Sequence, residues 1–229
     1  MSKYQGELFL YGLTELSDAA AESLSKHQGE TLDLSGLTEV SDAAAESLSK
    51  HQGYLYLGLK ELSEAAAESL SKYQGELFLY GLTELSDTAA ESLSKHQGDL
   101  YLGLKELSDA AAESLSKHES ELDLSGLTEL SDAAAESLSK HEGELHLSGL
   151  KELSEAAAES LSKHEGELDL SGLTELSDAA AESLSKHESR IYLLGWTKLS
   201  NAAAKSLAKI DPEKLIISEM IEEQVARFF

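Results

Sequence analysis

The sequence predicts a right-handed α/β solenoid with a parallel sheet on its concave face and helices on its convex face. Residues 2–18 recur letter for letter at residues 71–87, which indicates tandem duplication. Each repeated unit joins a strand pattern to a helix pattern. A Leu-x-Leu pair, with Ile191 as the one substitution, marks nine units mostly 23 residues apart: Leu8/Leu10, Leu32/Leu34, Leu55/Leu57, Leu77/Leu79, Leu100/Leu102, Leu122/Leu124, Leu145/Leu147, Leu168/Leu170 and Ile191/Leu193.

The first element of each unit is a short strand. Residues 7–11 of the first unit, Glu-Leu-Phe-Leu-Tyr, alternate between leucine and variable positions, which is the period of a strand with one buried face. Because strand side chains alternate between faces, the leucines point inward and Phe9 points out from the sheet. Gly12 then supplies the turn that leaves the strand.

The second element is a helix in the phrase LSDAAAESLSKHQG. Ser17 is a good N-cap, and Asp18 suits the positive end of the helix. His27 falls near the negative end, where a positive or amphipathic group is favourable, and Gly29 predicts a left-handed stop. One face of this helix is apolar at helical spacing: Leu16, Ala19, Ala20 and Leu24.

A single unit cannot bury its apolar face, so stacking of neighbouring units must create the core. We expect residues 1–210 to form nine stacked repeats of about 23 residues. Met1 stands where other units have leucine, which predicts a start within a repeat and an uncapped N-terminal end. Residues 211–229 break the pattern and predict a capping strand and helix, with three apolar residues on one helical face: Ile221, Val225 and Phe228.

The pattern LxLxGLxxLxxxAAxxLxxxxG, which extends over about residues 2–210, resembles leucine-rich repeats, particularly the short alanine-rich variety of bacterial proteins. Two departures are visible. The asparagine usual in such repeats is replaced by Leu13, Leu37 and their equivalents, and the leucine that usually precedes the Leu-x-Leu pair is missing. The resemblance implies a layered fold and recognition of a partner on the concave strand face.

Composition narrows the class of function. The chain has 229 residues, with 43 acidic and 18 basic side chains, for a net charge of −25. This charge repels phosphate backbones and anionic membranes, so we expect no nucleic-acid partner. No apolar run approaches the roughly 20 residues of a membrane-spanning helix, so we expect no membrane insertion. The absence of cysteine excludes disulfides and thiolate metal sites, and no compartment follows from the sequence.

Variation is concentrated at the outward positions of the strands. Adjacent strands lie about 4.8 Å apart, so five rings from the third to the fifth units should form a continuous aromatic patch. One interpretation is that stacked rings stabilise neighbouring strands. The other is a binding surface, because such a patch exceeds what is usual on a monomer. The candidate ligand-binding residues are Phe9, Tyr11, Tyr54, Tyr56, Phe78, Tyr80, Tyr101, Asp123, His146, Asp169 and Tyr192.

Asp123, His146 and Asp169 should stack on three consecutive strands with serines beside them, which raises the question of catalysis or metal binding. A sheet face offers no pocket and no evident oxyanion donors, so no catalytic residue is predicted. Two carboxylates around an imidazole could hold a divalent cation. The favoured interpretation is a polar ladder that makes His146 more basic, with no metal and no cofactor.

Two further series have structural interpretations. The histidines equivalent to His27 are replaced by Tyr4 and Tyr73 in two units, which is poor behaviour for a metal ligand. The glutamates equivalent to Glu22 lie four residues before a lysine, as expected for a solvated convex face. Trp196 stands where other units have a leucine, and we expect it in the core.

The sequence therefore favours a non-enzymatic recognition module that binds a protein, a peptide or a carbohydrate on its concave sheet. A structural or adhesive repeat array without a specific ligand is the alternative. An uncapped N-terminal end would also allow a homodimer. Recombination explains the copied blocks, and Val40 and Thr88 are irregularities that a designed consensus array would lack.

Overall fold

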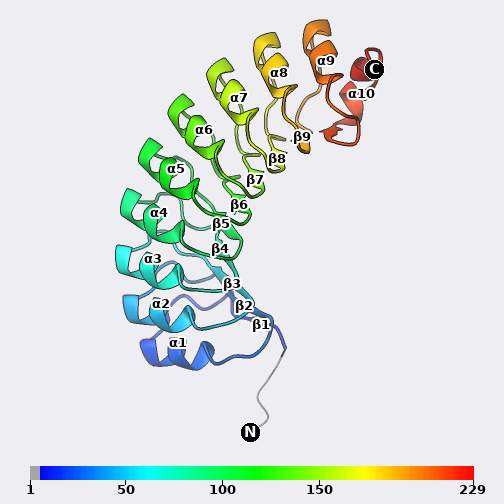
Figure 1. The fold of residues 1–229 in the computed structure, drawn as a ribbon. Coiled ribbons are helices and arrows are strands. Elements are labelled where there is room, and N and C mark those ends of the chain that lie inside the picture. The colour runs from blue at the N-terminus through cyan, green and yellow to red at the C-terminus, as the bar shows by residue number, and fades with distance from the viewer. Residues whose placement is uncertain (1–5) are drawn as a thin grey trace.

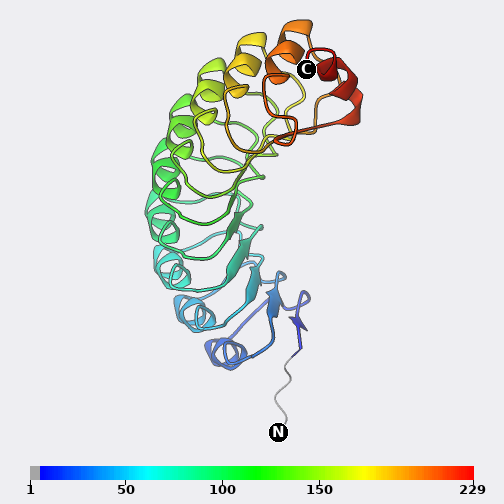
Figure 2. The same cartoon turned by 45° about the vertical axis from the view of Figure 1, so that its right-hand side comes forward.

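The computed structural model describes residues 6–229 as a curved stack of strand–helix units (Figure 1). Ten parallel strands form one sheet in sequence order, from β1 to β10. The strands line the inner side of the curve and the helices line the outer side (Figure 2). The predicted α/β solenoid is confirmed, while the right-handedness of its crossovers remains a prediction.

The strands are short and the helices nearly uniform. The strands are β1 (Leu8–Phe9), β2 (Thr31–Leu34), β3 (Tyr54–Leu57), β4 (Glu76–Leu79), β5 (Leu100–Leu102), β6 (Leu122–Asp123), β7 (Leu145–His146), β8 (Leu168–Asp169), β9 (Ile191–Leu193) and β10 (Leu215–Ile217). The helices are α1 (Asp18–Leu24), α2 (Asp42–Leu48), α3 (Glu64–Leu70), α4 (Asp87–Leu93), α5 (Asp109–Leu115), α6 (Asp132–Leu138), α7 (Glu155–Leu161), α8 (Asp178–Leu184), α9 (Asn201–Leu207) and α10 (Glu219–Ala226).

The core lies between the sheet and the helix layer. Leu55, Leu77 and Leu100 are direct partners across three parallel strands, and all three are fully buried. Two alanines and the last leucine of each helix from α2 to α8 meet them from the other layer. Each buried leucine contributes roughly 1.5–3 kcal/mol, so the monotonous leucine rows account for the stability of the stack.

A serine caps each helix from α1 to α9, and at seven of these helices the same serine also joins the preceding repeat. The hydroxyl of Ser131 accepts the amide hydrogen of Ala134 at 3.0 Å, as an N-cap does. The same hydroxyl donates to the carboxylate of Asp109, in the preceding repeat, at 2.5 Å. Matching contacts join Ser41 to Asp18, Ser63 to Asp42, Ser108 to Asp87, Ser154 to Asp132, Ser177 to Glu155 and Ser200 to Asp178.

Replacement of Ser131 by alanine should therefore cost more than the loss of a cap alone. We expect Ser131→Ala to lower the free energy of unfolding by about 1–2 kcal/mol, because both bonds are lost. Urea denaturation followed by circular dichroism measures this change. Ser139→Ala is the matched control, because the Ser139 hydroxyl donates only within its own repeat, to the Glu136 carbonyl. Equal losses in the two variants would contradict the coupling.

The helix ends differ from the sequence-based expectation. Helix α1 stops at Leu24, and the amides of Lys26 and His27 then bond to carbonyls three residues back. The last turn is thus closed by tight turns with right-handed backbone angles. Gly29 does not have a positive φ, so the predicted left-handed stop is wrong; among the described glycines, Gly53 alone has one, at 112°.

Of the two characters expected for the histidine series, positive or amphipathic, the positive one is wrong. Five consecutive histidines are buried, and their rings lie parallel with centroids 6.0–6.2 Å apart. Burial lowers the pKa of each ring, because a buried imidazolium lacks water around its charge. Tyr73 stacks on the first ring and donates its hydroxyl to the Gly53 carbonyl at 2.5 Å. The histidine stack is His96, His118, His141, His164 and His187.

The C-terminal elements extend the stack. Strand β10 pairs with β9, and Ile221 and Val225 of helix α10 are fully buried. Trp196 is buried, which confirms its expected place in the core. Phe228 is 41% exposed, so the expectation that it shares the packed face is wrong; it lies beyond the last helical turn. The expectations about Met1 and the N-terminal end concern residues 1–5, outside the described residues.

Candidate binding surface

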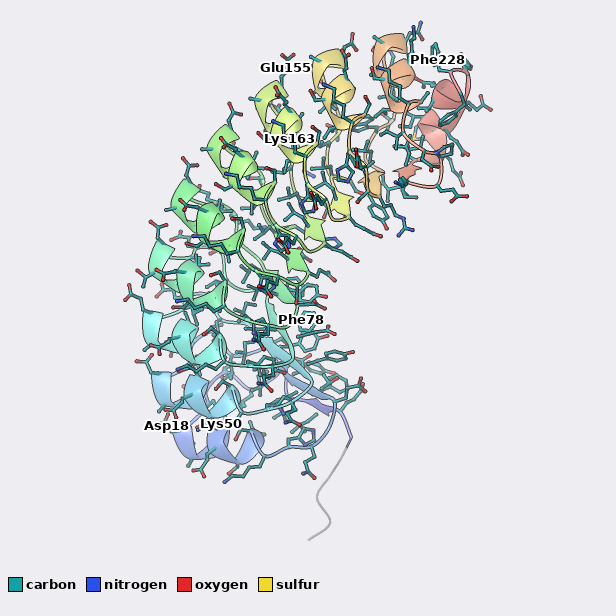
Figure 3. All side chains as sticks on the ribbon, in the orientation of Figure 1. Asp18, Lys50, Phe78, Glu155, Lys163 and Phe228 are labelled. Carbon is teal, nitrogen blue, oxygen red and sulfur yellow. The ribbon has the colours of Figure 1, made fainter. Side chains whose placement is uncertain are left out.

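The concave sheet presents its variable side chains in columns. Parallel pairing places Tyr56, Phe78 and Tyr101 directly beside one another on β3, β4 and β5. Figure 3 shows Phe78 on the inner side of the curve, whereas Asp18, Lys50 and Glu155 extend from the helix layer. The strands thus collect side chains from distant parts of the sequence onto one face.

Five of the candidate residues form one aromatic cluster centred on Phe78. The Phe78 ring stacks on Tyr56 with centroids 4.0 Å apart and on Tyr101 with centroids 4.3 Å apart. Tyr54 meets the Phe78 ring edge-on at 6.4 Å, and Tyr80 lies 5.9 Å from it. Offset or edge-on ring pairs contribute roughly 0.5–1.5 kcal/mol each beyond their buried area. We call Tyr54, Tyr56, Phe78, Tyr80 and Tyr101 the aromatic cluster.

The members of the aromatic cluster differ in what they offer to a ligand. Phe78 is only 8% exposed, since its two neighbours cover both faces of its ring. Tyr80 is 54% exposed, while Tyr54, Tyr56 and Tyr101 are half-buried. The four tyrosines therefore form the accessible surface, and Phe78 supports them from within.

Three aromatic candidates lie outside this cluster. Phe9 and Tyr11 stack on each other with centroids 5.6 Å apart, at the N-terminal end of the sheet. Strand β2 places Asp33 between Phe9 and Tyr56 in the register, which separates the pair from the aromatic cluster. Tyr192 donates its hydroxyl to Glu167 at 3.0 Å near the other end.

A column of carboxylates beside the aromatic cluster was not among the sequence-based candidates. These residues lie two positions before the variable site of each strand and therefore point to the same face. The same alternation rule would have found them if it had been applied to the residue two positions before each variable site. We call Glu76, Asp99, Glu121, Glu144 and Glu167 the acidic column.

The acidic column gives the concave face a negative potential. Burial raises the pKa of Tyr80 to about 12, and the nearby Asp123 and Glu121 carboxylates add to the shift. Burial also raises the pKa of Glu121, and the Asp99 carboxylate raises it further while His146 opposes the change. Glu76 has a raised pKa for the same two kinds of reason. Ionisation of Glu76 and Glu121 on this face is therefore less favourable than ionisation of the same groups in water.

His146 lies among acidic groups on three strands. Its Nδ1 atom is 3.7 Å from Asp169 Oδ2, and its Nε2 atom is 3.3 Å from Glu121 Oε1 and 3.9 Å from Glu144 Oε2. The contact with Asp169 raises the pKa of His146 despite partial burial. Burial alone would raise the pKa of Asp169, but hydrogen bonds from His146 and Ser171 hold it below its usual value.

This arrangement differs from the cation site considered from the sequence. Asp123 accepts a bond from the Ser125 amide at 2.7 Å and affects His146 only by its charge. The side chains whose ligand atoms come within 4.8 Å of one another are instead Glu121, Glu144 and His146. Parallel register brings them together, since they occupy adjacent columns on adjacent strands.

Many carboxylates on the convex face, unlike most of those on the concave face, are paired with lysines. Seven glutamates on the helices pair with a lysine four residues later, with N–O distances of 2.8–3.6 Å, as the sequence predicts. In the acidic column, Glu167 pairs with Arg190 at 2.6 Å. Within residues 6–229, no lysine or arginine forms an ion pair with the other four members. The concave carboxylates are thus less completely paired than the convex ones, with His146 near Glu121 and Glu144 and Arg190 on Glu167.

The candidate surface is an open face. Five surface hollows of the described chain lie between successive helix ends, for example among Glu136, Lys140 and Glu159, or along neighbouring loops. The aromatic cluster lines none of them. Such a broad face suits the docking of a chain or a folded surface better than the enclosure of a small molecule.

Comparison with known proteins identifies the fold. No family model and no curated protein matches the sequence. Among solved structures, the chain is similar to Toll in the Drosophila Toll–Spatzle complex, with a TM-score of 0.52 and 13% identity. That match covers 69% of this chain and 22% of the other. A Listeria monocytogenes internalin, inlF, matches with a TM-score of 0.50 and 12% identity, covering 94% of this chain and 68% of the other.

Both neighbours are leucine-rich-repeat proteins, and the fold of this chain is a leucine-rich-repeat-like solenoid. The chain spans about a fifth of the length of the Toll chain it matches. None of the helices in the described part is both long and apolar enough to cross a membrane.

Proposed function

We propose that the protein is a non-enzymatic binding module whose concave sheet docks a protein or peptide ligand. The aromatic cluster is the observation that supports this most directly. Four accessible tyrosines, held by a buried phenylalanine, provide large and rigid contact surfaces with polar tips. Such residues are typical anchors of protein interfaces, and the similarity to Toll in complex with Spatzle is consistent with this use of the fold.

A display experiment with random peptides tests the proposal directly. Peptides selected against the intact chain are measured for affinity against the triple variant Tyr56→Ser, Tyr80→Ser and Tyr101→Ser. Loss of these contacts should weaken binding about 10- to 100-fold, since each anchor contributes on the order of 1 kcal/mol. Phe78 stays in place because its loss would disturb the packing of the sheet.

Tyr11→Ser is the matched control. Tyr11 is an exposed tyrosine on the same face, outside the aromatic cluster, so its replacement should change affinity less than about twofold. Binders that tolerate the triple variant as well as they tolerate Tyr11→Ser would overturn the proposal. They would favour a structural or adhesive array without a specific concave ligand. If carbohydrates rather than peptides bound and their binding depended on the same three tyrosines, the ligand class would change but the binding surface would remain.

A further inference from the structure

The distribution of ion pairs sets the concave face apart from the rest of the molecule. The helix glutamates are neutralised by lysines in their own repeats. Within residues 6–229, Glu76, Asp99 and Glu121 have no lysine or arginine partner, and Glu121 lies 3.3 Å from the His146 ring. These three carboxylates occupy one position on consecutive repeats. Their spacing follows the strand spacing of about 4.8 Å.

The same three carboxylates lie against the aromatic cluster. Glu76 is the register partner of Tyr54. Backbone bonds from the Leu77 amide to the Asp99 carbonyl and from the Leu100 amide to the Glu121 carbonyl place the other two beside β4 and β5. Besides burial, the charges of Glu121, Asp99 and Glu76 all raise the pKa of Tyr101. The pKa of Tyr56 is raised by burial and then by Glu76 and Asp33. Flat rings and carboxylates without a lysine or arginine partner thus share one surface. A cation placed there would meet a ring face and a carboxylate together.

We propose that the occupant of this surface is an arginine-rich segment of a partner protein, an inference that rests on the proposed function. A guanidinium group stacks on an aromatic face and donates a planar pair of hydrogen bonds to a carboxylate. A ring and a carboxylate occur together at Tyr101 and Glu121, because the Leu100 amide bonds to the Glu121 carbonyl at 3.0 Å and so joins their two strands. The carboxylates are spread over successive strands, so a single small ion would satisfy one or two of them. Successive arginines of one chain would satisfy the series.

The probe is a fluorescein-labelled peptide of repeated Gly-Arg, with Gly-Lys and Gly-Glu peptides of equal length as comparisons. Binding is measured by fluorescence anisotropy in the presence of EDTA, so that no metal ion bridges peptide and protein. The arginine peptide should bind about 3- to 10-fold more tightly than the lysine peptide, because lysine lacks the planar stacking group. The glutamate peptide should not bind. Equal affinity for arginine and lysine peptides would overturn the role of the rings.

Two variants that lose the same number of negative charges distinguish binding at the concave carboxylates from attraction to the net charge of the protein. The concave variant is Glu76→Gln, Asp99→Asn and Glu121→Gln, which keeps side-chain oxygens as hydrogen-bond acceptors. It should weaken the arginine peptide about 10- to 100-fold, with a smaller effect of added salt than in the unmodified protein.

The convex variant removes the same number of charges from the same repeats: Glu91→Gln, Glu113→Gln and Glu136→Gln. It should change affinity less than about twofold, because these carboxylates are already paired and lie on the other face. Equal losses in the two variants would show attraction to net charge alone and would overturn the inference. Circular dichroism and thermal unfolding confirm that both variants remain folded.

The two proposals fail in different ways. If library-selected peptides depend on the tyrosines but are not rich in arginine and ignore the concave carboxylate variant, the binding module stands and the arginine-rich partner is wrong. If no peptide depends on the tyrosines, both proposals fail.

Discussion

Acidification from about pH 6.5 to about pH 4 should sharply destabilise the protein, because the histidine stack is buried in its neutral form. Burial lowers the pKa of His164 from 6.5 to about 4, which corresponds to on the order of 3 kcal/mol for this residue alone. The charges of His141 and His187 on either side add to the shift. Protonation of one ring therefore opposes protonation of its neighbours.

The direction of the effect follows from proton linkage. Between the lowered folded-state pKa and the unfolded value, the unfolded chain binds more protons than the folded chain. The contribution of the histidine stack to stability is therefore complete above about pH 6.5 and is lost as the pH falls. Each histidine with a lowered pKa adds a slope of at most about 1.4 kcal/mol per pH unit below its unfolded value. His146 has a raised pKa and acts in the opposite direction, as do Glu76 and Glu121.

His96→Tyr tests the histidine stack with a residue that the chain already uses there. Tyr73 occupies the equivalent place in the preceding repeat, in the same Lys-x-Gln-Gly context, and is buried. The variant should fold and should reduce the slope of unfolding free energy against pH below about pH 6.5, by at most about 1.4 kcal/mol per unit. Urea denaturation at several pH values measures the slope.

Charged groups from neighbouring segments also face the histidine stack. Asp99 lies near His96 and His118 and acts against the lowering of their pKa values, whereas Lys214 adds to the lowering at His187. His146→Gln, outside the stack, should leave the acid-induced loss in place. An unchanged slope in His96→Tyr would contradict the assignment of the acid-induced loss to the stack.

The second large effect is expected from Gly126→Ala. A Cβ atom on Gly126 would lie 2.5 Å from the Leu104 carbonyl oxygen and 2.6 Å from the Gly103 carbonyl carbon, both in the preceding repeat. These atoms belong to the backbone and cannot turn away as a side chain would. The variant must separate two repeats, so we expect a loss at or above the upper end of roughly 1–3 kcal/mol. Thermal and urea unfolding measure it.

Gly143→Ser provides the control at a different glycine position of the same unit. Ser120 and Ser189 occupy the equivalent place in other repeats, in the same His-Glu-Ser context. The Ser120 hydroxyl donates to the Gln97 carbonyl at 3.0 Å, so the backbone at this position can adjust to a side chain. We expect Gly143→Ser to cost less than about 1 kcal/mol. If Gly126→Ala were equally mild, the close approach of neighbouring repeats would not explain its glycine.

The fold could be predicted from sequence because each repeat has the same pattern of strand and helix residues. Nine copies of the Leu-x-Leu pair determine the register, and register alone brings Tyr56, Phe78 and Tyr101 together. Helix length was less predictable, because the tight turn after Leu24 depends on how the chain returns to the sheet. The predicted role of Gly29 was wrong for the same reason.

The site was only partly predictable. Alternation along the strand identified the aromatic positions, but the burial of Phe78 depends on rings from two other repeats. The acidic column is hard to distinguish in the sequence, because its carboxylates stand among many others in a strongly acidic chain. The pairing of lysines with convex glutamates was expected, yet the resulting charge difference between faces emerges only when both layers are placed in space.

The most direct test of the concave docking surface is fluorine NMR of protein labelled with 3-fluorotyrosine. The chain has eight tyrosines, which include Tyr56, Tyr80 and Tyr101 in the aromatic cluster and buried Tyr73 outside it. Addition of a saturating selected peptide should shift the signals of Tyr56, Tyr80 and Tyr101 and leave the signal of Tyr73 unchanged. Saturation that leaves those three signals in place would contradict docking on the concave sheet.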